Sequence, residues 1–457
     1  MTNNHIKAAI LGGALAMLGG AIQAGATSPS DPEPLAYVYH VENRGATLPP
    51  PPLPTMGNLP LIGPLPDPFT WANDPLDMGG TRSTSATDWS RHRSQILAQI
   101  QNYEIGTKPA VDPSQVTASY ATNTLTVITT VGTNSLTLTC AVSLPTGSGP
   151  FPVVIGIQRP DGSLPSIAFD SRNIASVTFL HNQVTTYNRP KNTDPFFQLY
   201  GPAQNTRNTG QYAAWAWGIS RVIDGLYQMT NSLPLDLDHI AVTGCSYAGK
   251  MALFAGAMDE RVALTVAQES GGGGDTSWRY SHTETNKVET LEHTSNVWFA
   301  KQMFQFGNSY VSFLPEDHDE LMALCAPRAL YVTGNTNYTW LSNPSAFVCD
   351  EAAEKIYQTL GIGDRFGFNV DGGHQHCMFP HDQTNDLAYF LDKFMLGKTS
   401  LSSTITTYPP NYSNIDYAGW TAWWGTTNAA FPGGATNAIS QAIDAETAPI
   451  LGAIWKY

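Results

Sequence analysis

The chain is poor in charged residues, and cations are its scarcest charged type. Only 13% of its 457 residues are Asp, Glu, Lys or Arg, against roughly a quarter in an average soluble protein. Lys and Arg number 23 against 37 Asp and Glu, so the net charge is −14. Proteins that bind nucleic acids or anionic membrane surfaces need clustered positive charge. The composition therefore argues against nucleic acid and anionic lipid as partners.

Long apolar runs are also lacking, apart from one at the N-terminus. Residues 8–22 read AAILGGALAMLGGAI, which is short and glycine-rich for a span that needs about 20 apolar residues. A polar segment ending in Lys7 precedes this run, and Ala24-x-Ala26 follows it as a cleavage site. The pattern predicts a signal peptide over 1–26 and a secreted protein, extracellular or periplasmic, with no membrane contact after cleavage.

Composition divides the remaining chain into three parts. Residues 27–64 are rich in proline, with LPPPPLP at 48–54, and we interpret them as a linker without a core. Residues 65–400 have the patterning of a globular domain. Residues 401–457 form a C-terminal extension rich in Thr, Tyr, Trp and Pro, whose last thirty residues fit no recognisable element.

Strands and helices alternate along most of the globular part. A helical pattern (88–106) and two antiparallel-type strands (124–131 and 136–145) come first. Buried-type strands follow at 151–157, 174–179, 239–244, 262–268 and 328–334, with helical patterns at 211–229 and 384–395 among them. Such alternation predicts an α/β fold with a mostly parallel central sheet and helices on both faces, a three-layer sandwich.

A serine lies between one of these strands and a helix, in the stretch VTGCSYAGKMALFAG. Gly244-x-Ser246-x-x-Gly249 has the context of a nucleophile elbow, although the common form has its second glycine one residue earlier. The helix N-terminus would turn backbone N–H groups toward developing negative charge. A plain strand–turn–helix with a capping serine would show the same pattern.

A nucleophilic serine needs a base and an acid. In α/β-hydrolases the histidine follows the last strand, and DGGHQHCMFPHD offers His374, His376 and His381 there. The segment after the strand 328–334 contains no carboxylate. Glu269, which ends the strand after the nucleophile helix, is the candidate acid, and a rim carboxylate capping the SGGGG loop is the other interpretation.

The cysteines select one histidine. Exported proteins tend to pair their cysteines, and Cys245 precedes Ser246 while Cys377 follows His376. If the serine oxygen and the imidazole lie within about 3 Å, the neighbouring Cα atoms can approach the roughly 4.4–6.8 Å of a disulfide. This predicts a Cys245–Cys377 bridge and selects His376 as the base. The other three of the five cysteines leave at least one thiol unpaired.

No cofactor or metal is predicted. The GGGG run follows a strand but lacks the lysine and spacing of a phosphate-binding loop. Histidines 374, 376 and 381 cluster near an aspartate, yet no closed Cys/His ligand set appears.

Several segments together resemble one family. In chain order the sequence contains GCSYAGK, AQESGGGG, NVWF, APRALYV, TWL and HC. They resemble the glucuronoyl esterases of carbohydrate esterase family fifteen, α/β-hydrolases that cleave the ester between lignin alcohols and glucuronic acid side chains of xylan. The similarity runs from about residue 65 to 397. It implies a triad of Ser246, Glu269 and His376, with Lys250 and Trp340 binding the sugar.

The sequence departs from that family at three positions. Tyr247 stands where the family has an arginine that helps hold the oxyanion, and a phenol cannot supply a charged donor. Glu289 matches a sugar-binding glutamine by a gapped match, and Ser295 matches a glutamate. The resemblance therefore implies an intact triad with Tyr247 at the oxyanion and an altered sugar site formed by Lys250, Glu289 and Trp340.

Three functions are compatible with this sequence. The first is a secreted, monomeric serine esterase acting on plant cell-wall polysaccharide, with 4-O-methyl-glucuronoyl esters of glucuronoxylan favoured. The second is an acetyl- or feruloyl-type carbohydrate esterase of the same fold. The third is a non-catalytic carbohydrate-binding protein, which would need neither the triad nor its flanking cysteines.

Overall fold

The computed structural model describes residues 38–47, 53–71, 82–284, 287–398, 401 and 405–426. The predicted signal peptide and the last thirty-one residues of the C-terminal extension lie outside these ranges. Within them, no helix is both long and apolar enough to span a bilayer.

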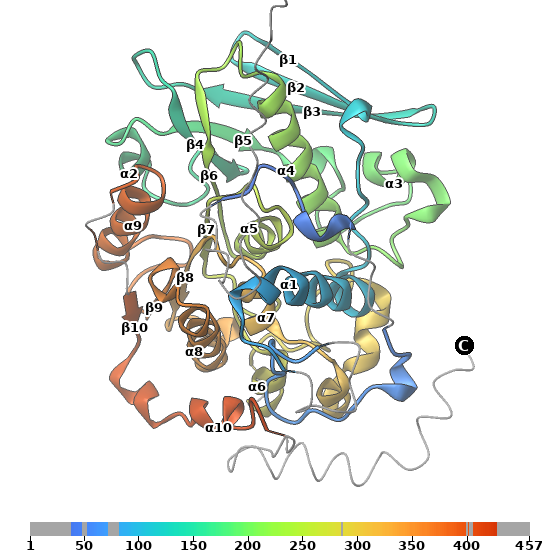
Figure 1. Cartoon of the computed structure of the whole chain (residues 1–457), viewed down its shortest axis with the longest axis vertical. Helices are drawn as coiled ribbons and strands as arrows, with labels where there is room; N and C mark the ends of the chain where they lie inside the picture. Colours follow the sequence, from blue (N-terminus) through green and yellow to red (C-terminus); the bar gives the residue numbers. More distant parts are fainter. Residues whose placement is uncertain are drawn as a thin grey trace, which may run out of the picture. The chain divides into compact units, whose positions relative to one another are not determined.

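A ten-stranded sheet organises the described chain (Figure 1). Its strand order is β1-β2-β3-β5-β4-β6-β7-β8-β9-β10. The strands are β1 (Val116–Ala121), β2 (Thr124–Val131), β3 (Asn134–Ser143), β4 (Phe151–Ile157), β5 (Ala175–Phe179), β6 (Leu235–Cys245), β7 (Leu264–Gln268), β8 (Ala329–Asn335), β9 (Phe366–Asp371) and β10 (Ile405–Thr407).

The sheet is antiparallel at one edge and parallel elsewhere. β1, β2 and β3 form a meander, and β3 pairs antiparallel with β5. Buried and exposed residues alternate along β3, as expected for a sheet with one covered face. From β5 to β10 every neighbouring pair is parallel. The prediction of a mostly parallel sheet after an antiparallel start is confirmed.

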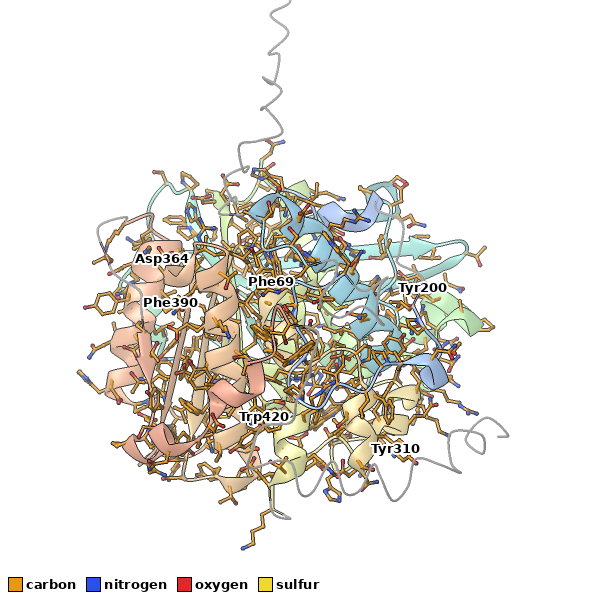
Figure 2. All side chains as sticks on the ribbon, turned by 60° about the horizontal axis from the view of Figure 1, so that its bottom comes forward. Phe69, Tyr200, Tyr310, Asp364, Phe390 and Trp420 are labelled. Atoms are coloured by element: carbon orange, nitrogen blue, oxygen red, sulfur yellow. A yellow bond between two sulfur atoms is a disulfide. The ribbon has the colours of Figure 1, made fainter. Side chains whose placement is uncertain are left out.

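Helices cover both faces of the parallel part. They are α1 (Ala86–Ile100), α2 (Ser166–Asp170), α3 (Pro195–Tyr200), α4 (Gln211–Gln228), α5 (Tyr247–Met258), α6 (Trp278–Thr283), α7 (His318–Ala323), α8 (Asn343–Thr359), α9 (His381–Phe394) and α10 (Tyr417–Thr421). Alternate residues of β4 join different apolar clusters: Val153 and Ile155 pack with α1, α4, α5 and α8, whereas Val154 packs with α2 and α9. Side chains fill both interiors, including the labelled Phe390 of α9 (Figure 2). The three-layer α/β-hydrolase fold is confirmed.

Part of the segment interpreted as a linker packs on the domain. The Glu42 carboxylate bonds the side chains of Lys108 and Arg221, and Arg44 Nε lies 3.2 Å from Glu260 Oε1. These partners are buried or half-buried, so the pairs are shielded from solvent. Contact with the domain therefore begins well before residue 65, the predicted boundary.

The described part of the C-terminal extension also docks. β10 adds a strand to the sheet, and Trp423 Nε1 donates to the carbonyl of Leu65 at 2.7 Å. The backbone N–H of Gly425 donates to Asp67 Oδ2 at 2.8 Å. Trp420, labelled in Figure 2, is buried in the larger apolar cluster. Residues 405–426 thus fasten the start of the globular domain.

Candidate active site

The predicted triad residues follow strands that share one edge of the sheet. β6, β7, β8 and β9 are adjacent and parallel, so their carboxyl ends meet at that edge. Ser246 follows β6, Glu269 follows β7 and His376 lies five residues after β9. In open parallel sheets this edge is where ligands bind.

Ser246 occupies a sharp bend between β6 and α5. Its φ of 59° and ψ of −125° are unusual for a residue with a side chain. Two glycines make room for the bend. A Cβ on Gly244 would lie 2.4 Å from the carbonyl oxygen of Ala248, and one on Gly249 would lie 2.5 Å from that of Gln268. The Ser246 N–H donates to the same Gln268 oxygen at 2.9 Å, which ties the bend to β7.

The carboxylate of Glu269 is buried and fully engaged. Only 1% of Glu269 is exposed. Its Oε2 accepts from His376 Nδ1 at 2.5 Å, and its Oε1 accepts from the N–H of Cys377 at 3.1 Å. With Nδ1–H donated to the acid, Nε2 is the ring atom left to accept a proton. Its contacts are those of an orienting acid, whereas the rim interpretation expected a solvent-facing carboxylate.

The other two candidate histidines have different neighbours. His374 Nε2 lies 2.9 Å from Asp371 Oδ1, and its Nδ1 is 3.8 Å from Glu269 Oε1. Burial raises the pKa of Asp371 to about 6. His381 is exposed at the start of α9. The structure therefore brings His376, rather than these two, into a short contact with Glu269.

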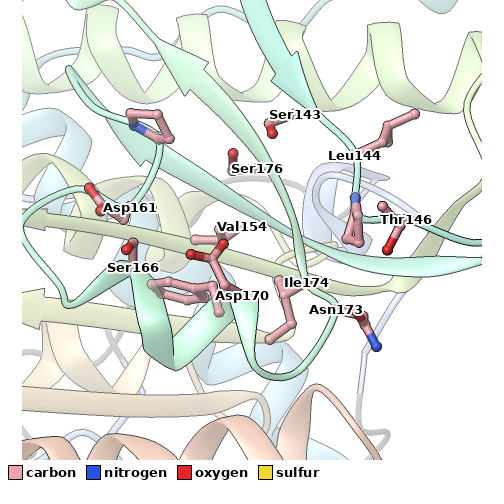
Figure 3. Close-up of a pocket in the computed structure, with 13 residues that line it drawn as sticks. Ser143, Leu144, Thr146, Val154, Asp161, Ser166, Asp170, Asn173, Ile174 and Ser176 are labelled. Carbon is pink, nitrogen blue, oxygen red and sulfur yellow. The ribbon is translucent and has the colours of Figure 1, made fainter.

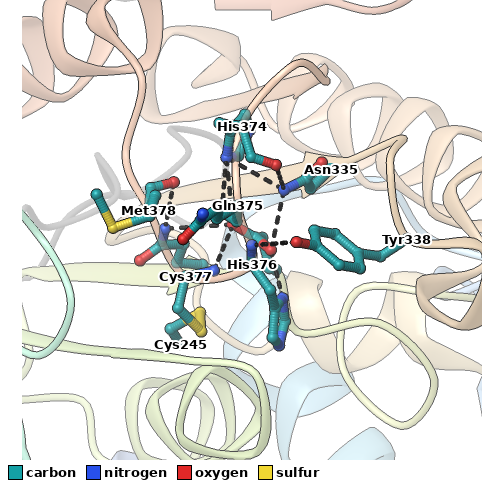
Figure 4. Close-up of a disulfide and its surroundings, with 10 residues drawn as sticks. Cys245, Asn335, Tyr338, His374, Gln375, His376, Cys377 and Met378 are labelled. Atoms are coloured by element: carbon teal, nitrogen blue, oxygen red, sulfur yellow. Dashed lines mark hydrogen bonds and ion pairs between the residues drawn. A yellow bond between two sulfur atoms is a disulfide. The ribbon is translucent and has the colours of Figure 1, made fainter.

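The predicted disulfide is confirmed. Cys245 and Cys377 are bonded, with Cα atoms 5.7 Å apart, and the bridge joins the serine bend to the histidine loop (Figure 4). A ring nitrogen of His376 and both sulfurs lie within 4.8 Å of one another. Because these sulfurs form a disulfide, they offer no thiolates to a metal. Three buried thiols are free: Cys140, Cys325 and Cys349.

Lys250 and Glu289 form an ion pair one helical turn from the serine. Lys250 Nζ lies 3.0 Å from Glu289 Oε2, and the lysine side chain is 4% exposed. The other carboxylate oxygen accepts from Thr294 Oγ1 at 2.6 Å. The ammonium group also lies 5.2 Å from the centre of the Trp298 ring. The predicted sugar-binding cation is thus neutralised by the predicted sugar-binding acid.

Trp340 is an exposed aromatic beside the base. Its side chain is among the exposed large apolar groups, at 47%, and its ring lies edge-on to His376 with centroids 5.8 Å apart. The Tyr338 hydroxyl accepts from the backbone N–H of His376 at 2.8 Å. Ser295 is occupied elsewhere, because its Oγ donates to Asn188 Oδ1 at 3.3 Å.

Sequence reasoning missed the surroundings of Tyr247. Its Oη lies 3.3 Å from His181 Nε2, and its ring centre is 4.4 Å from that of Tyr187. Burial raises the pKa of this phenol, against a hydrogen bond from the Gln158 side chain that lowers it. Gln158 follows β4 and His181 follows β5. The signal that would have found them is their place directly after two predicted parallel strands.

A separate cavity lies beside α2. It has a volume of about 330 Å³ and is lined by residues of β3, β4, β5 and the loop around α2, including Asp161, Ser166 and Asp170 (Figure 3). None of the predicted site residues lines it.

Comparison with known proteins identifies the family. A family model described as "Glucuronyl esterase, fungi" matches residues 127–361. A 4-O-methyl-glucuronoyl methylesterase of Schizophyllum commune is 40% identical over 346 residues, which cover 73% of this chain and 83% of that protein. The chain belongs to the glucuronoyl esterase family. It is accordingly a carboxylic ester hydrolase.

Solved glucuronoyl esterases share the fold. The crystal structure of recombinant glucuronoyl esterase from Sporotrichum thermophile matches with a TM-score of 0.72 and 34% identity, over 80% of this chain and 96% of that one. A serine-to-alanine form of that enzyme, in complex with methyl 4-O-methyl-β-D-glucopyranuronate, matches with a TM-score of 0.71 and 34% identity, over 81% and 97%. The family resemblance of the sequence is confirmed.

Proposed function

We propose that this glucuronoyl esterase hydrolyses 4-O-methyl-glucuronoyl esters of glucuronoxylan through a triad of Ser246, His376 and Glu269. The observation that carries the proposal is the 2.5 Å contact between Glu269 and His376, on a histidine loop that the disulfide fastens to the serine bend. A carbohydrate-binding protein would need neither feature.

The geometry supports a two-step mechanism. His376 Nε2 takes the proton of Ser246 Oγ as this oxygen attacks the ester carbonyl, and Glu269 stabilises the resulting imidazolium. The oxyanion is held by the backbone N–H of Tyr247, the residue after the nucleophile, at the positive end of α5. His376 then protonates the departing alcohol. Water, activated by the same imidazole, releases the acid and restores Ser246.

The sugar-binding groups suit a neutral uronate ester. Lys250 and Glu289 offer a donor and an acceptor to sugar hydroxyls, and their charges cancel. Trp340 supplies an exposed aromatic face beside the base. The related enzyme from Sporotrichum thermophile holds methyl 4-O-methyl-β-D-glucopyranuronate, an ester of this class. Polysaccharide is therefore the expected binding partner. All proposed site residues come from a single chain, so we expect the enzyme to act as a monomer.

The disulfide also supports secretion. Structural disulfides persist in oxidising compartments, which agrees with the signal peptide predicted over 1–26. Mass analysis of the exported protein, compared with the full sequence, tests cleavage after Ala26. An uncleaved cytoplasmic product would contradict it.

Substrate competition tests the function. We expect acid release from benzyl 4-O-methylglucuronate with kcat/KM at least tenfold above that for acetylated or feruloylated xylan fragments, and Ser246→Ala to abolish it. Substituting the serine removes the nucleophile while the bend keeps its backbone hydrogen bond to Gln268. A Ser246→Ala rate within tenfold of wild type would contradict the serine mechanism.

The second candidate, an acetyl- or feruloyl-type esterase, is favoured by one observation. Ser295 is bonded to Asn188, where the family has a sugar-binding glutamate. A reversed order of kcat/KM among the same substrates would establish it.

A further inference from the structure

Tyr247, the residue after Ser246, has polar neighbours that follow strands on the side away from the triad. β4 and β5 lie on one side of β6, and β7 to β9 lie on the other. Glu269 and His376 follow strands of the second group, whereas Gln158 and His181 follow β4 and β5. Both sets sit at the same carboxyl edge. In α/β-hydrolases the residue after the nucleophile supplies a backbone N–H to the oxyanion, so the Gln158 and His181 side chains lie beside a residue that borders the oxyanion.

His181 is buried among aromatic side chains beside Tyr247. It is 1% exposed, and its ring lies 5.2 Å from Trp215 and 5.8 Å from Tyr187, centre to centre. Its Nε2 lies 3.3 Å from Tyr247 Oη. Burial lowers the pKa of His181 to about 4, so the ring is neutral at neutral pH and carries a single N–H.

The position of that N–H follows from the surroundings. Within the described residues, Nδ1 of His181 is buried and has no group in hydrogen-bonding geometry. The nearby Asn182 Oδ1 accepts from the backbone N–H of Tyr187 at 2.9 Å. A buried N–H without a partner costs more than an unused lone pair. The proton therefore resides on Nε2, and His181 donates to Tyr247 Oη.

This donation determines what the phenol can do. A phenolic oxygen has two lone pairs and one hydrogen. His181 donates to one lone pair, so the phenolic hydrogen is not donated to His181. That hydrogen is available to another group. Tyr247 is half-buried and directly follows the nucleophile, so an ester bound at Ser246 would lie near it.

We infer that His181 is a positioning residue: it holds Tyr247 so that the phenolic O–H donates to the ester bound at Ser246. The inference rests on the proposed esterase function. A neutral O–H then stands where the family has a charged arginine. A neutral donor gives less transition-state stabilisation than a charged one, and it leaves the pocket less cationic.

A double-mutant cycle on benzyl 4-O-methylglucuronate tests this role. We expect His181→Phe to lower kcat about fivefold, which corresponds to the free energy of one neutral hydrogen bond, and to change KM less than twofold. In the Tyr247→Phe background, which lacks the phenolic oxygen, the same change should lower kcat less than 1.5-fold. Equal losses in both backgrounds would overturn the inference, because a structural role does not depend on the hydroxyl.

A matched pair of amide variants tests the donor atom without removing polarity. His181→Gln places an N–H near the position of Nε2, whereas His181→Asn places one nearer Nδ1. We expect the glutamine variant to keep at least half of the wild-type kcat, and the asparagine variant to lose as much as His181→Phe. Equal rates for the two would also overturn the inference. Failure of the esterase proposal is recognised separately, because wild type would then not turn over this ester or would do so without Ser246.

Discussion

Removing the bridge between the serine bend and the histidine loop is expected to destabilise the whole domain. The perturbation is the double substitution Cys245→Ala and Cys377→Ala. The bridge closes a loop of 132 residues. In the chain-entropy relation, releasing such a loop stabilises the unfolded chain by about 5 kcal/mol at 25 °C. Domains of ordinary stability have 5 to 15 kcal/mol in total, roughly, so the expected loss is a large fraction.

The same substitution should also impair catalysis. Ser246 and His376 stand on loops from strands that are not neighbours in the sheet, and the disulfide is their covalent link. Without it, the histidine loop is held by hydrogen bonds such as those that His376 donates to Tyr338 and Glu269. We expect kcat to fall at least tenfold with KM nearly unchanged, because misplacing the base affects the transition state more than substrate binding.

Urea unfolding followed by tryptophan fluorescence measures the first effect, and ester hydrolysis well below the unfolding transition measures the second. Cys140→Ala is the matched control, because Cys140 is buried, like Cys245, but makes no bridge. If the free energy of unfolding of the double variant lies within about 1 kcal/mol of that of the control, the predicted effect of the bridge is refuted. Loss of a sulfur atom from a packed interior alone costs about that much.

Three further predictions concern the acid, the oxyanion side chain and pH. Glu269→Gln should lower kcat by about 10³-fold or more, since the amide cannot stabilise the imidazolium; a loss below tenfold would make the Asp371–His374 pair the acid and base. Tyr247→Arg should raise kcat about tenfold more than it changes KM, through a charged donor, and unchanged kinetics would show that the backbone N–H suffices. The free energy of unfolding should fall as pH rises from 5 to 8. In this range buried carboxyl groups with raised pKa stay protonated in the folded state, whereas the unfolded chain has lost these protons. Equal urea midpoints at pH 5 and pH 8 would contradict this. These groups are Asp275, whose pKa is raised to about 6, and Glu316, Asp319, Glu320 and Asp350, all raised chiefly by burial.

The sheet was predictable because its central strands are buried on both faces. FPVVIGI of β4 is a continuous apolar run, and alternate residues of it serve two different clusters. The packing of residues 38–47 was not predictable from composition. Glu42 pairs with Lys108 and Arg221, which lie 66 and 179 residues away. A proline-rich segment with scattered charges gives no local sign of such distant partners.

The residues of the proposed triad could be chosen from the sequence because each has a local signature: glycines around Ser246, a strand end at Glu269 and a cysteine beside His376. The surroundings of Tyr247 have only a weak one, the place of Gln158 and His181 just after two predicted parallel strands. His181 and Tyr187 come from the loop after β5, and their contact with Tyr247 depends on strand order, β5-β4-β6, which sequence spacing does not reveal. A histidine in a loop is also common without a role.

The three departures from the family act together on the charge of the pocket. By the family resemblance, Tyr247 stands in place of an arginine and removes a positive charge, Ser295 stands in place of a glutamate and removes a negative one, and Glu289 stands in place of a neutral glutamine and adds a negative one. The net change is one unit more negative, and the remaining cation, Lys250, is paired with Glu289 at 3.0 Å. The substrate ester is neutral, so its binding depends little on this change. The acid released is an anion, and a site whose Lys250 is already paired with Glu289 is expected to hold it less tightly. We therefore expect the same replacements to weaken oxyanion stabilisation and to favour release of product.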